Sequence, residues 1–274
     1  MEWLLLLGTT GFAVFAGMIG AMLGLGGGVF MILFYLLALN LPAHQAVALS
    51  LIAVVGSSCI GGSFYIKEGL TNLRLAMSME TFTVTGAVIG AFVGFALPPQ
   101  AIQALLGVVL FYTSWAVLRR RRSEPRNSQN DRLGGEFYDM ACNQHVRYRI
   151  ERLGIGFASS LAGGIISGII GIGGGVLLVP IMNAVMKIPM KAAAATSNFM
   201  VGLTAAASAA VYYSAGAVDL QLSVPSVLGV MVGAFIGTKA MVRTESAVLK
   251  KFLSVLLVFF GVVLLLRAWG ILSW

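Results

Sequence analysis

The sequence predicts an all-α polytopic membrane protein made of two inverted repeats of about four helical segments each. Hydrophobic residues make up 58% of its 274 residues and charged residues only 10%, so a soluble domain of this composition would expose a mostly apolar surface. Apolar runs of about 18 residues or more recur along the chain, which is long enough to cross a hydrocarbon core of about 30 Å. These runs are continuous and do not alternate, which excludes a transmembrane barrel.

An internal duplication is the second observation behind this prediction. A single fixed offset aligns the two halves of the chain without a gap. It matches Gly24, Gly26, Gly27 and Gly28 with Gly171, Gly173, Gly174 and Gly175, and it also matches Pro42 with Pro189, Ser50 with Ser197, and Tyr65 with Tyr212. We therefore expect a first transmembrane repeat at residues 1–118, a basic linker at 119–152 and a second transmembrane repeat at 153–274.

Each repeat contains four apolar stretches. They cover residues 4–38, 45–66, 75–96 and 101–118 in the first repeat, and 153–186, 192–213, 220–241 and 248–272 in the second. The first stretch of each repeat is too long for one straight span, and its middle carries a glycine cluster, "GLGGG" or "GIGGG". Because consecutive glycines destabilise a helix, each cluster predicts a broken stretch, either a re-entrant segment or a pair of arms that cross the membrane.

The basic residues are the third observation, and they predict the orientation of the repeats. If every stretch crossed the membrane once, the 18 Lys and Arg residues would be divided between both sides. If each broken stretch enters and leaves on the same side, all of them except Arg267 fall on the side of the linker. The positive-inside rule favours the second arrangement. The linker is then cytoplasmic, and both termini are expected in the periplasm.

The two glycine clusters are the first candidate binding site. Non-helical backbone persists at membrane depth only where it is buried or lines a cavity, and a helix that restarts there directs N–H groups and a positive dipole end at that cavity. Two such ends from opposite sides would bind an anion at the midplane between the repeats. The residues predicted to bind the substrate in this way are Gly26, Gly27, Gly28, Gly173, Gly174 and Gly175. Tight helix packing is the alternative.

Polar residues on the helix after each break form the second candidate site. Ser50 and Ser57 in the first repeat match Ser197 and Thr204 in the second, and Asn198 follows Ser197 directly. Hydroxyl and amide groups can donate to an oxyanion without the cost of burying a cation. We therefore predict that these five residues bind the substrate. Ordinary hydrogen bonds between helices are the alternative.

Glu80 is the acidic residue that lies well inside an apolar stretch. Its match in the second repeat is Val227, so any role would belong to one repeat only. A carboxylate inside the membrane is a candidate proton carrier. The alternative is that Glu80 reaches back to Arg74 or Lys67 near the start of its stretch.

Glycines also recur every four residues in stretches 75–96 and 220–241, at Gly86, Gly90, Gly94, Gly229, Gly233 and Gly237. This spacing predicts close packing against a neighbouring helix.

The remaining features argue against other classes of protein. The net charge of +8 comes mainly from segment ends and the linker, including the run Arg119–Arg122, where topology and contact with anionic lipid explain it better than nucleic acid. Cys59 and Cys142 have no CxxC neighbour, so neither a disulfide nor a metal site is expected. The sequence contains no hydrolase or nucleotide-binding motif. We therefore predict no enzyme activity and no cofactor.

Two stretches carry a resemblance to a known family: "GLGGGVFMILFYLLALNLPAHQAVALSLIAV" and "GIGGGVLLVPIMNAVMKIPMKAAAATSNFMV", with "GAVIGAFVG" and "GVMVGAFIGTKA" following them. The sequence resembles the sulfite exporter TauE/SafE family of bacterial membrane transporters. A proline is typical of the family's broken segment. This sequence has it only in the second repeat, at Pro180, and the matching residue of the first repeat is Leu33.

The resemblance implies export of a small sulfur-containing anion, such as sulfite, sulfoacetate or another organosulfonate, across the bacterial inner membrane. The residues alone lead only to an anion-compatible cavity between inverted repeats. A passive anion channel and a transporter of a non-sulfur organic anion stay open as alternatives. The expected partners are the small anion and membrane lipids, with no nucleic acid, and a homodimer is compatible with the sequence.

Overall fold

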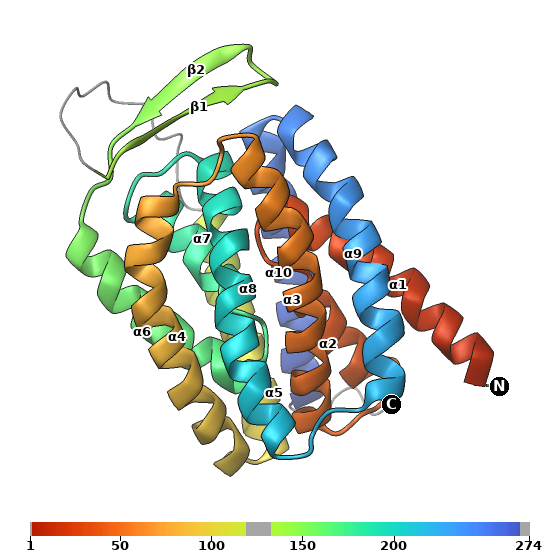
Figure 1. Ribbon diagram of the computed structural model, residues 1–274. Helices are drawn as coiled ribbons and strands as arrows, with labels where there is room; N and C mark the ends of the chain where they lie inside the picture. The colour runs from red at the N-terminus through yellow and green to blue at the C-terminus, as the bar shows by residue number, and fades with distance from the viewer. Residues whose placement is uncertain (1, 119–132, 269–274) are drawn as a thin grey trace.

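The computed structural model describes residues 2–118 and 133–268, which form ten α-helices and one β-hairpin (Figure 1). The first half of the chain folds into α1 (Glu2–Leu23), α2 (Gly28–Leu37), α3 (Ala43–Lys67), α4 (Leu73–Ala96) and α5 (Pro99–Leu118). The hairpin strands are β1 (Gly135–Asp139) and β2 (Gln144–Tyr148). The second half folds into α6 (Leu153–Ile170), α7 (Gly175–Ala184), α8 (Met190–Ser214), α9 (Leu220–Arg243) and α10 (Ser246–Ala268).

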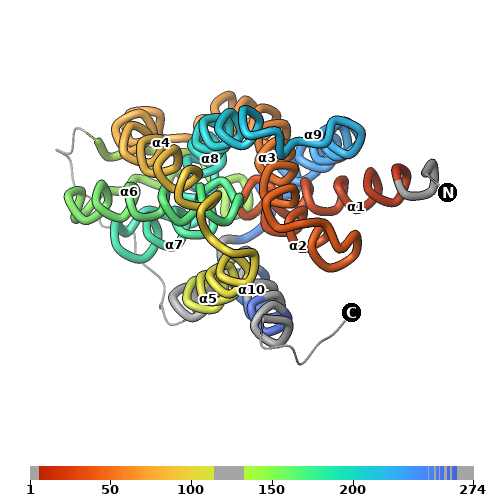
Figure 2. Tube along the Cα trace, turned by 90° about the horizontal axis from the view of Figure 1, so that it is seen from below, coloured from red at the N-terminus to blue at the C-terminus, as the bar shows by residue number. Residues whose placement is uncertain are grey.

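Seen along the bundle axis, the helices form three rows (Figure 2). The first row holds α4, α8, α3 and α9 in that order, so helices from the two halves alternate. The second row holds α6 with α7 and α1 with α2, where α6 packs on α4 and α1 packs on α9. The pair of α5 and α10 forms the third row. The two halves of the chain are therefore interleaved.

Six of the described helices are long and apolar enough to cross a membrane: Leu6–Leu23 of α1, together with α3, α4, α6, α8 and α9. The chain is a multi-pass helical membrane protein, as the composition predicted. The expected apolar stretches each correspond to one helix, except that the first stretch of each half forms two. The end of the last expected stretch, 269–272, lies outside the described residues.

Both glycine clusters interrupt their stretch, and the chain then runs back. Phe34 of α2 stacks on Phe12 of α1 with ring centroids 4.4 Å apart, so the two helices are antiparallel neighbours. In the second half, the N–H of Glu151 donates to the carbonyl of Met186 at 3.2 Å, which joins the chain before α6 to the chain after α7. Each returning helix has 10 residues and is about 15 Å long. Pro180 in α7 does not change this length relative to α2.

The turns between α3 and α4 and between α8 and α9 use matching residues in the two halves. Gly69 after α3 and Gly216 after α8 have φ of 67° and 74°, the left-handed conformation that closes a helix C-terminus. The side chain of Asn72 then accepts from the N–H of Leu75 at 3.1 Å and caps α4. Asp219 caps α9 in the same way, 2.8 Å from the N–H of Gln221. Local sequence chemistry therefore sets these boundaries.

The repeated glycines of α4 and α9 are packing positions, which confirms the prediction for them. A methyl group at Gly86 or Gly90 would collide with a backbone carbonyl of α6, and at Gly233 or Gly237 with a carbonyl of α1. The absence of a side chain lets each pair of backbones approach closely.

The linker contains a β-hairpin that the sequence did not predict. Strands β1 and β2 are antiparallel, with Asp139 opposite Gln144, and the hairpin lies across one end of the bundle (Figure 1). The Lys191 ammonium at the start of α8 lies 2.7 Å from the Asp139 carboxylate, with side chains only 1% and 9% exposed. Lys191 also donates to the carbonyl of Val242 at the end of α9, at 3.0 Å. The hairpin is therefore bonded to the helical core.

A second contact joins the hairpin to the start of α4. The Asn72 amide donates to the carbonyl of Leu133 at 2.8 Å and to the Tyr148 hydroxyl at 3.4 Å. Burial raises the pKa of the Tyr148 phenol, which keeps the hydroxyl neutral. The run Arg119–Arg122 lies outside the described residues.

Candidate functional site

The two glycine breaks have the same backbone conformation. In the first break, Gly24, Gly26 and Gly27 have φ of 74°, 67° and 79°, and in the second Gly171, Gly173 and Gly174 have φ of 74°, 72° and 89°. Residues with a Cβ avoid this left-handed region, so the clusters are glycines because the turn requires them. Gly28 and Gly175 then start α2 and α7.

The two breaks lie against each other inside the bundle. A methyl group at Gly175 would come within 2.9 Å of the Leu25 Cα in the first break. A methyl group at Gly26 would lie 3.0 Å from side-chain carbons of both Val54 and Val201, and one at Gly173 would approach the same two valines at 2.9 and 2.7 Å. Val54 and Val201, on α3 and α8, therefore pack against both breaks.

Serines of α3 and α8 bond each half to the break of the other. The Ser50 hydroxyl on α3 lies 2.5 Å from the carbonyl oxygen of Gly171 in the second break. The Ser197 hydroxyl on α8 donates to the carbonyl of Gly24 in the first break at 3.0 Å. These serines match each other in the duplicated sequence, and their bonds cross in opposite directions.

The other three predicted polar residues do not repeat this symmetry. The Ser57 hydroxyl donates to the carbonyl of Gly26, in its own half, at 2.6 Å. The Thr204 hydroxyl, its counterpart, instead lies 2.8 Å from Glu80. The Asn198 amide donates to the carbonyl of Ala21 at 3.3 Å, and its oxygen has no hydrogen-bond partner.

In this conformation the hydroxyls of Ser50, Ser57 and Ser197 are engaged with backbone carbonyls. A hydroxyl has one proton to donate, so these three have none left for an anion. All five predicted polar residues are 0% exposed. The glycines of both breaks are buried as well. The structure therefore brings the predicted residues together in a closed arrangement.

Glu80, predicted as a proton carrier, is 6% exposed on α4. Its Oε1 lies 2.8 Å from the Thr204 hydroxyl of α8, and its Oε2 has no hydrogen-bond partner. The hydrogen bond to Thr204 stands in place of the alternative, in which Glu80 would reach back to Arg74 or Lys67. Glu80 is thus joined to a residue that was predicted separately as an anion ligand.

Two tyrosines bond to the backbone near the breaks, and this role was not predicted from the sequence. The Tyr65 hydroxyl of α3 donates to the carbonyl of Ala21 at 2.8 Å, and the Tyr212 hydroxyl of α8 to the carbonyl of Gly168 at 3.2 Å. Each carbonyl lies in the last turn of the helix before a break. The match of Tyr65 with Tyr212 in the duplicated sequence was the signal that could have identified this pair.

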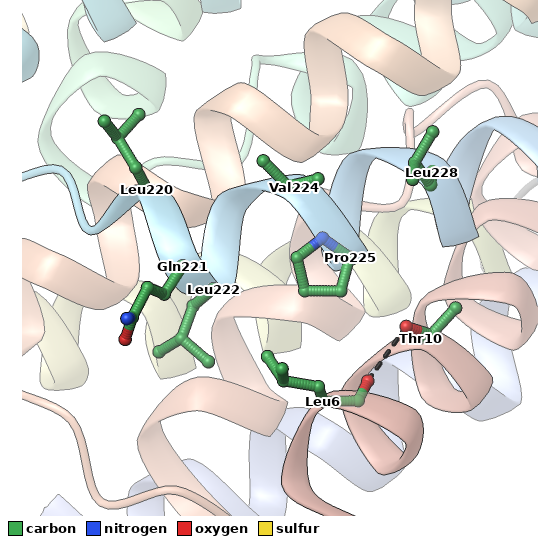
Figure 3. Close-up of a pocket in the computed structure, with 8 residues that line it drawn as sticks. All are labelled: Leu6, Thr10, Leu220, Gln221, Leu222, Val224, Pro225 and Leu228. Atoms are coloured by element: carbon green, nitrogen blue, oxygen red, sulfur yellow. Dashed lines mark hydrogen bonds between the residues drawn. The ribbon is translucent and has the colours of Figure 1, made fainter. Parts of the chain in front are cut away.

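A described pocket of about 490 Å³ lies away from the breaks, between the start of α1 and the start of α9 (Figure 3). Its lining is Leu6, Thr10, Leu220, Gln221, Leu222, Val224, Pro225 and Leu228. The Thr10 hydroxyl donates to the carbonyl of Leu6 at 2.8 Å. The mainly apolar lining suits a hydrocarbon chain better than an anion, and it contains none of the predicted site residues.

Among the residues that the structure describes, no three His, Cys, Asp or Glu side chains gather closely enough to hold a metal ion. The polar groups that meet at the breaks are hydroxyls, one amide and backbone carbonyls. These groups suit hydrogen bonding to a small ligand.

Broken helices that meet inside a bundle of membrane-spanning helices are the construction of membrane transporters. The comparison of sequences gives the same class. The chain belongs to the family described as Sulfite exporter TauE/SafE, which matches residues 9–264 and so includes both breaks and the hairpin. This confirms the resemblance seen in the sequence, and the protein is a membrane transporter of that family.

Bacterial relatives carry matching names. The probable membrane transporter protein YunE of Bacillus subtilis (strain 168) is 23% identical over 253 residues, covering 90% of this chain and 92% of the relative. The probable membrane transporter protein YdhB of the same organism is 24% identical over 234 residues, covering 85% of this chain and 89% of the relative. No solved structure matches the chain.

Proposed function

We propose that this protein is a secondary transporter that exports a small sulfur-containing anion across the bacterial inner membrane. The substrate class is sulfite, sulfoacetate or another organosulfonate, and the family name supports it. The anion binds at the midplane, where Gly26, Gly27 and Gly28 meet Gly173, Gly174 and Gly175.

The contact between the two breaks is the observation that carries this proposal. Two helices, α2 and α7, start from breaks that touch, so their positive dipole ends meet in a buried region. Such a region stabilises an anion and does not need a buried cation. Ser50, Ser57, Ser197 and Asn198 bond to backbone carbonyls at or beside the breaks, and these hydroxyl and amide groups become donors for the anion when those bonds open. Thr204, the fifth predicted ligand, lies on α8 beside Glu80.

The described conformation is a closed state of this site. Ser50 and Ser197 donate to carbonyls of the opposite break, and Val54 and Val201 fill the space beside the glycines. Movement of the halves apart would release both hydroxyls at once. The freed donors would then bind the oxygen atoms of the anion, so opening and binding are coupled.

The two halves act as inverted repeats about this site. The helix pairs support this: α1 packs on α9 as α6 packs on α4, and α3 packs on α9 as α8 packs on α4. The hairpin end of the bundle carries Lys67, Arg74, Lys187, Lys191 and Arg243, which supports a cytoplasmic position for that end. Both termini would then be periplasmic.

A binding screen tests the site. Purified protein is titrated calorimetrically with sulfite, sulfoacetate, taurine, sulfate and simple carboxylates. We expect a sulfur oxyanion to bind best, and Ser50→Ala or Ser197→Ala to weaken its binding roughly tenfold or more, because a donor to a charged group is lost. Ser63→Ala is the matched control, since exposed Ser63 bonds only to its own helix. Unchanged affinity in both site variants would overturn the assignment.

Counterflow in proteoliposomes tests the mechanism. A carrier exchanges labelled sulfonate faster when unlabelled sulfonate is present on the opposite side. Flux without this stimulation would indicate a passive channel, and covalent change of the substrate would indicate an enzyme. Either result would refute the proposed carrier.

A further inference from the structure

We infer that Glu80 is a proton-binding site of this transporter and that its protonated form favours binding of the anion. This inference deepens the proposed function, because it names a group whose protonation favours anion binding. It rests on the hydrogen bonds of Thr204, on the burial of Glu80 and on the groups that surround it.

The hydrogen bonds of Thr204 indicate that Glu80 carries a proton in this conformation. The Thr204 Oγ1 lies 2.8 Å from the Glu80 Oε1 and 3.0 Å from the carbonyl oxygen of Met200. A hydroxyl has one proton, and a carbonyl has none to give. Both contacts are full hydrogen bonds when Glu80 donates to Thr204 and Thr204 donates to Met200. An ionised Glu80 would compete with Met200 for the single Thr204 proton.

The second oxygen of Glu80 supports the same assignment. Its Oε2 is buried and has no hydrogen-bond partner, and the whole residue is only 6% exposed. An ionised carboxylate at such a position would leave charge without solvent or a donor, which is costly. A neutral carboxyl group leaves only one weak acceptor without a partner.

The elements packed against this part of α4 do not supply a cation. Helix α6 contains no titratable residue. Helix α8 contains Lys191, Tyr212 and Tyr213, but Lys191 lies thirteen residues before Thr204, about 20 Å along the helix, and is paired with Asp139. The Tyr212 hydroxyl donates to Gly168, and Tyr213 is exposed.

Helix α3 touches α4 more weakly, and its titratable groups are also directed elsewhere. Its His44 bonds to the carbonyl of Gly94, its Tyr65 to the carbonyl of Ala21, and its Cys59 and Lys67 are exposed. On α4 itself, Arg74 precedes Glu80 by six residues, about 9 Å along the axis. A proton is therefore the simplest way to neutralise Glu80.

Thr204 connects this proton to the anion site. Thr204 lies on α8 with Ser197, whose hydroxyl holds the first break. If Glu80 were ionised, its charge would repel an anion nearby in a medium of low dielectric constant. The proton on Glu80 removes this repulsion, so proton and anion bind with positive cooperativity. When the pH rises, Glu80 can release its proton as H⁺ and become a carboxylate, and the anion then binds less tightly.

Infrared spectroscopy tests the proton without any substrate. We expect the wild type at neutral pH to show the carbonyl stretch of a protonated carboxylic acid, and Glu80→Gln to lack it. Glu68→Gln, in the loop after α3, is the matched control and should keep the band. Raising the pH should bleach the band in the wild type itself, which removes any dependence on the folding of the variant. A wild-type spectrum without this band would overturn the inference.

Transport tests the coupling. We expect sulfoacetate counterflow by the wild type to speed up as the pH falls, and counterflow by Glu80→Gln to be insensitive to pH. If counterflow by Glu80→Gln kept the same pH dependence as counterflow by the wild type, the proposed coupling would be overturned. If neither protein exchanges a sulfonate, the proposed substrate is wrong, while the infrared result still decides whether Glu80 holds a proton.

Discussion

The hydroxyl of Ser50 lies 2.5 Å from the carbonyl oxygen of Gly171, which bonds a helix of the first half to the glycine break of the second. Ser197 makes the reciprocal bond to Gly24 at 3.0 Å. Because both bonds cross between the halves, both must break if the halves separate at this level. They therefore contribute to the stability of the closed arrangement as well as to the proposed anion site.

Ser50→Ala should lower the stability of the protein. The variant leaves the buried carbonyl of Gly171 without this donor, which costs about 1–3 kcal/mol. Ser63→Ala on the same helix should change stability much less, because the Ser63 hydroxyl is exposed and bonds within its own turn to Cys59. Thermal unfolding of both variants in detergent measures the difference. Equal melting temperatures would contradict a role for the bond between halves.

Gly24→Ala should be far more disruptive than Gly69→Ala. Both glycines have positive φ, 74° and 67°, so alanine costs about 1–2 kcal/mol at either position. A methyl group at Gly69 meets nothing within 4 Å, whereas at Gly24 it would collide with the backbone of Ala194 on α8. We expect Gly69→Ala to fold and Gly24→Ala to give little folded protein by size-exclusion chromatography. Similar yields would show that the first break is not packed against α8.

Lys191→Met should release the hairpin from the bundle. The variant leaves the Asp139 carboxylate nearly buried without its partner, and breaking a buried ion pair typically costs about 3–5 kcal/mol. Hydrogen exchange of residues 135–148 should therefore accelerate. Glu136→Gln is the control within the same hairpin: it removes an ion pair with Arg147 whose side chains are 61% and 68% exposed, worth about 0–1 kcal/mol. Unchanged exchange in Lys191→Met would show that other contacts hold the hairpin.

Cys142 should be accessible only from the cytoplasm. It is exposed in the turn of the hairpin, on the end of the bundle that carries the basic residues. In a Cys59→Ala background, a membrane-impermeant maleimide should label Cys142 in inside-out vesicles and leave it unlabelled in intact spheroplasts. A tag at the C-terminus should show the opposite accessibility. Labelling of Cys142 from outside would reverse the proposed orientation.

The helical segments could be predicted from the sequence because their signals are local. These signals are the apolar runs, the left-handed glycines and the caps at Asn72 and Asp219, and each acts over a few residues. The internal duplication, which matches Ser50 with Ser197, gives both halves the same signals. The hairpin was missed because its strands have five residues each and lie in a polar linker. Its stability comes from Lys191 and Asn72, which are distant in sequence.

The sequence by itself determined the membrane class, the two breaks and the residues around them, since hydropathy and glycine chemistry depend on near neighbours. Only the tertiary structure decided which groups meet. Ser50 bonds across to Gly171, Ser57 bonds within its own half to Gly26, and Thr204 meets Glu80. From the duplication alone, Ser57 and Thr204 would be expected to bond to equivalent residues of the two halves. Packing made the difference, because Glu80 has Val227 as its counterpart and the α4–α8 contact therefore offers Thr204 a carboxyl group.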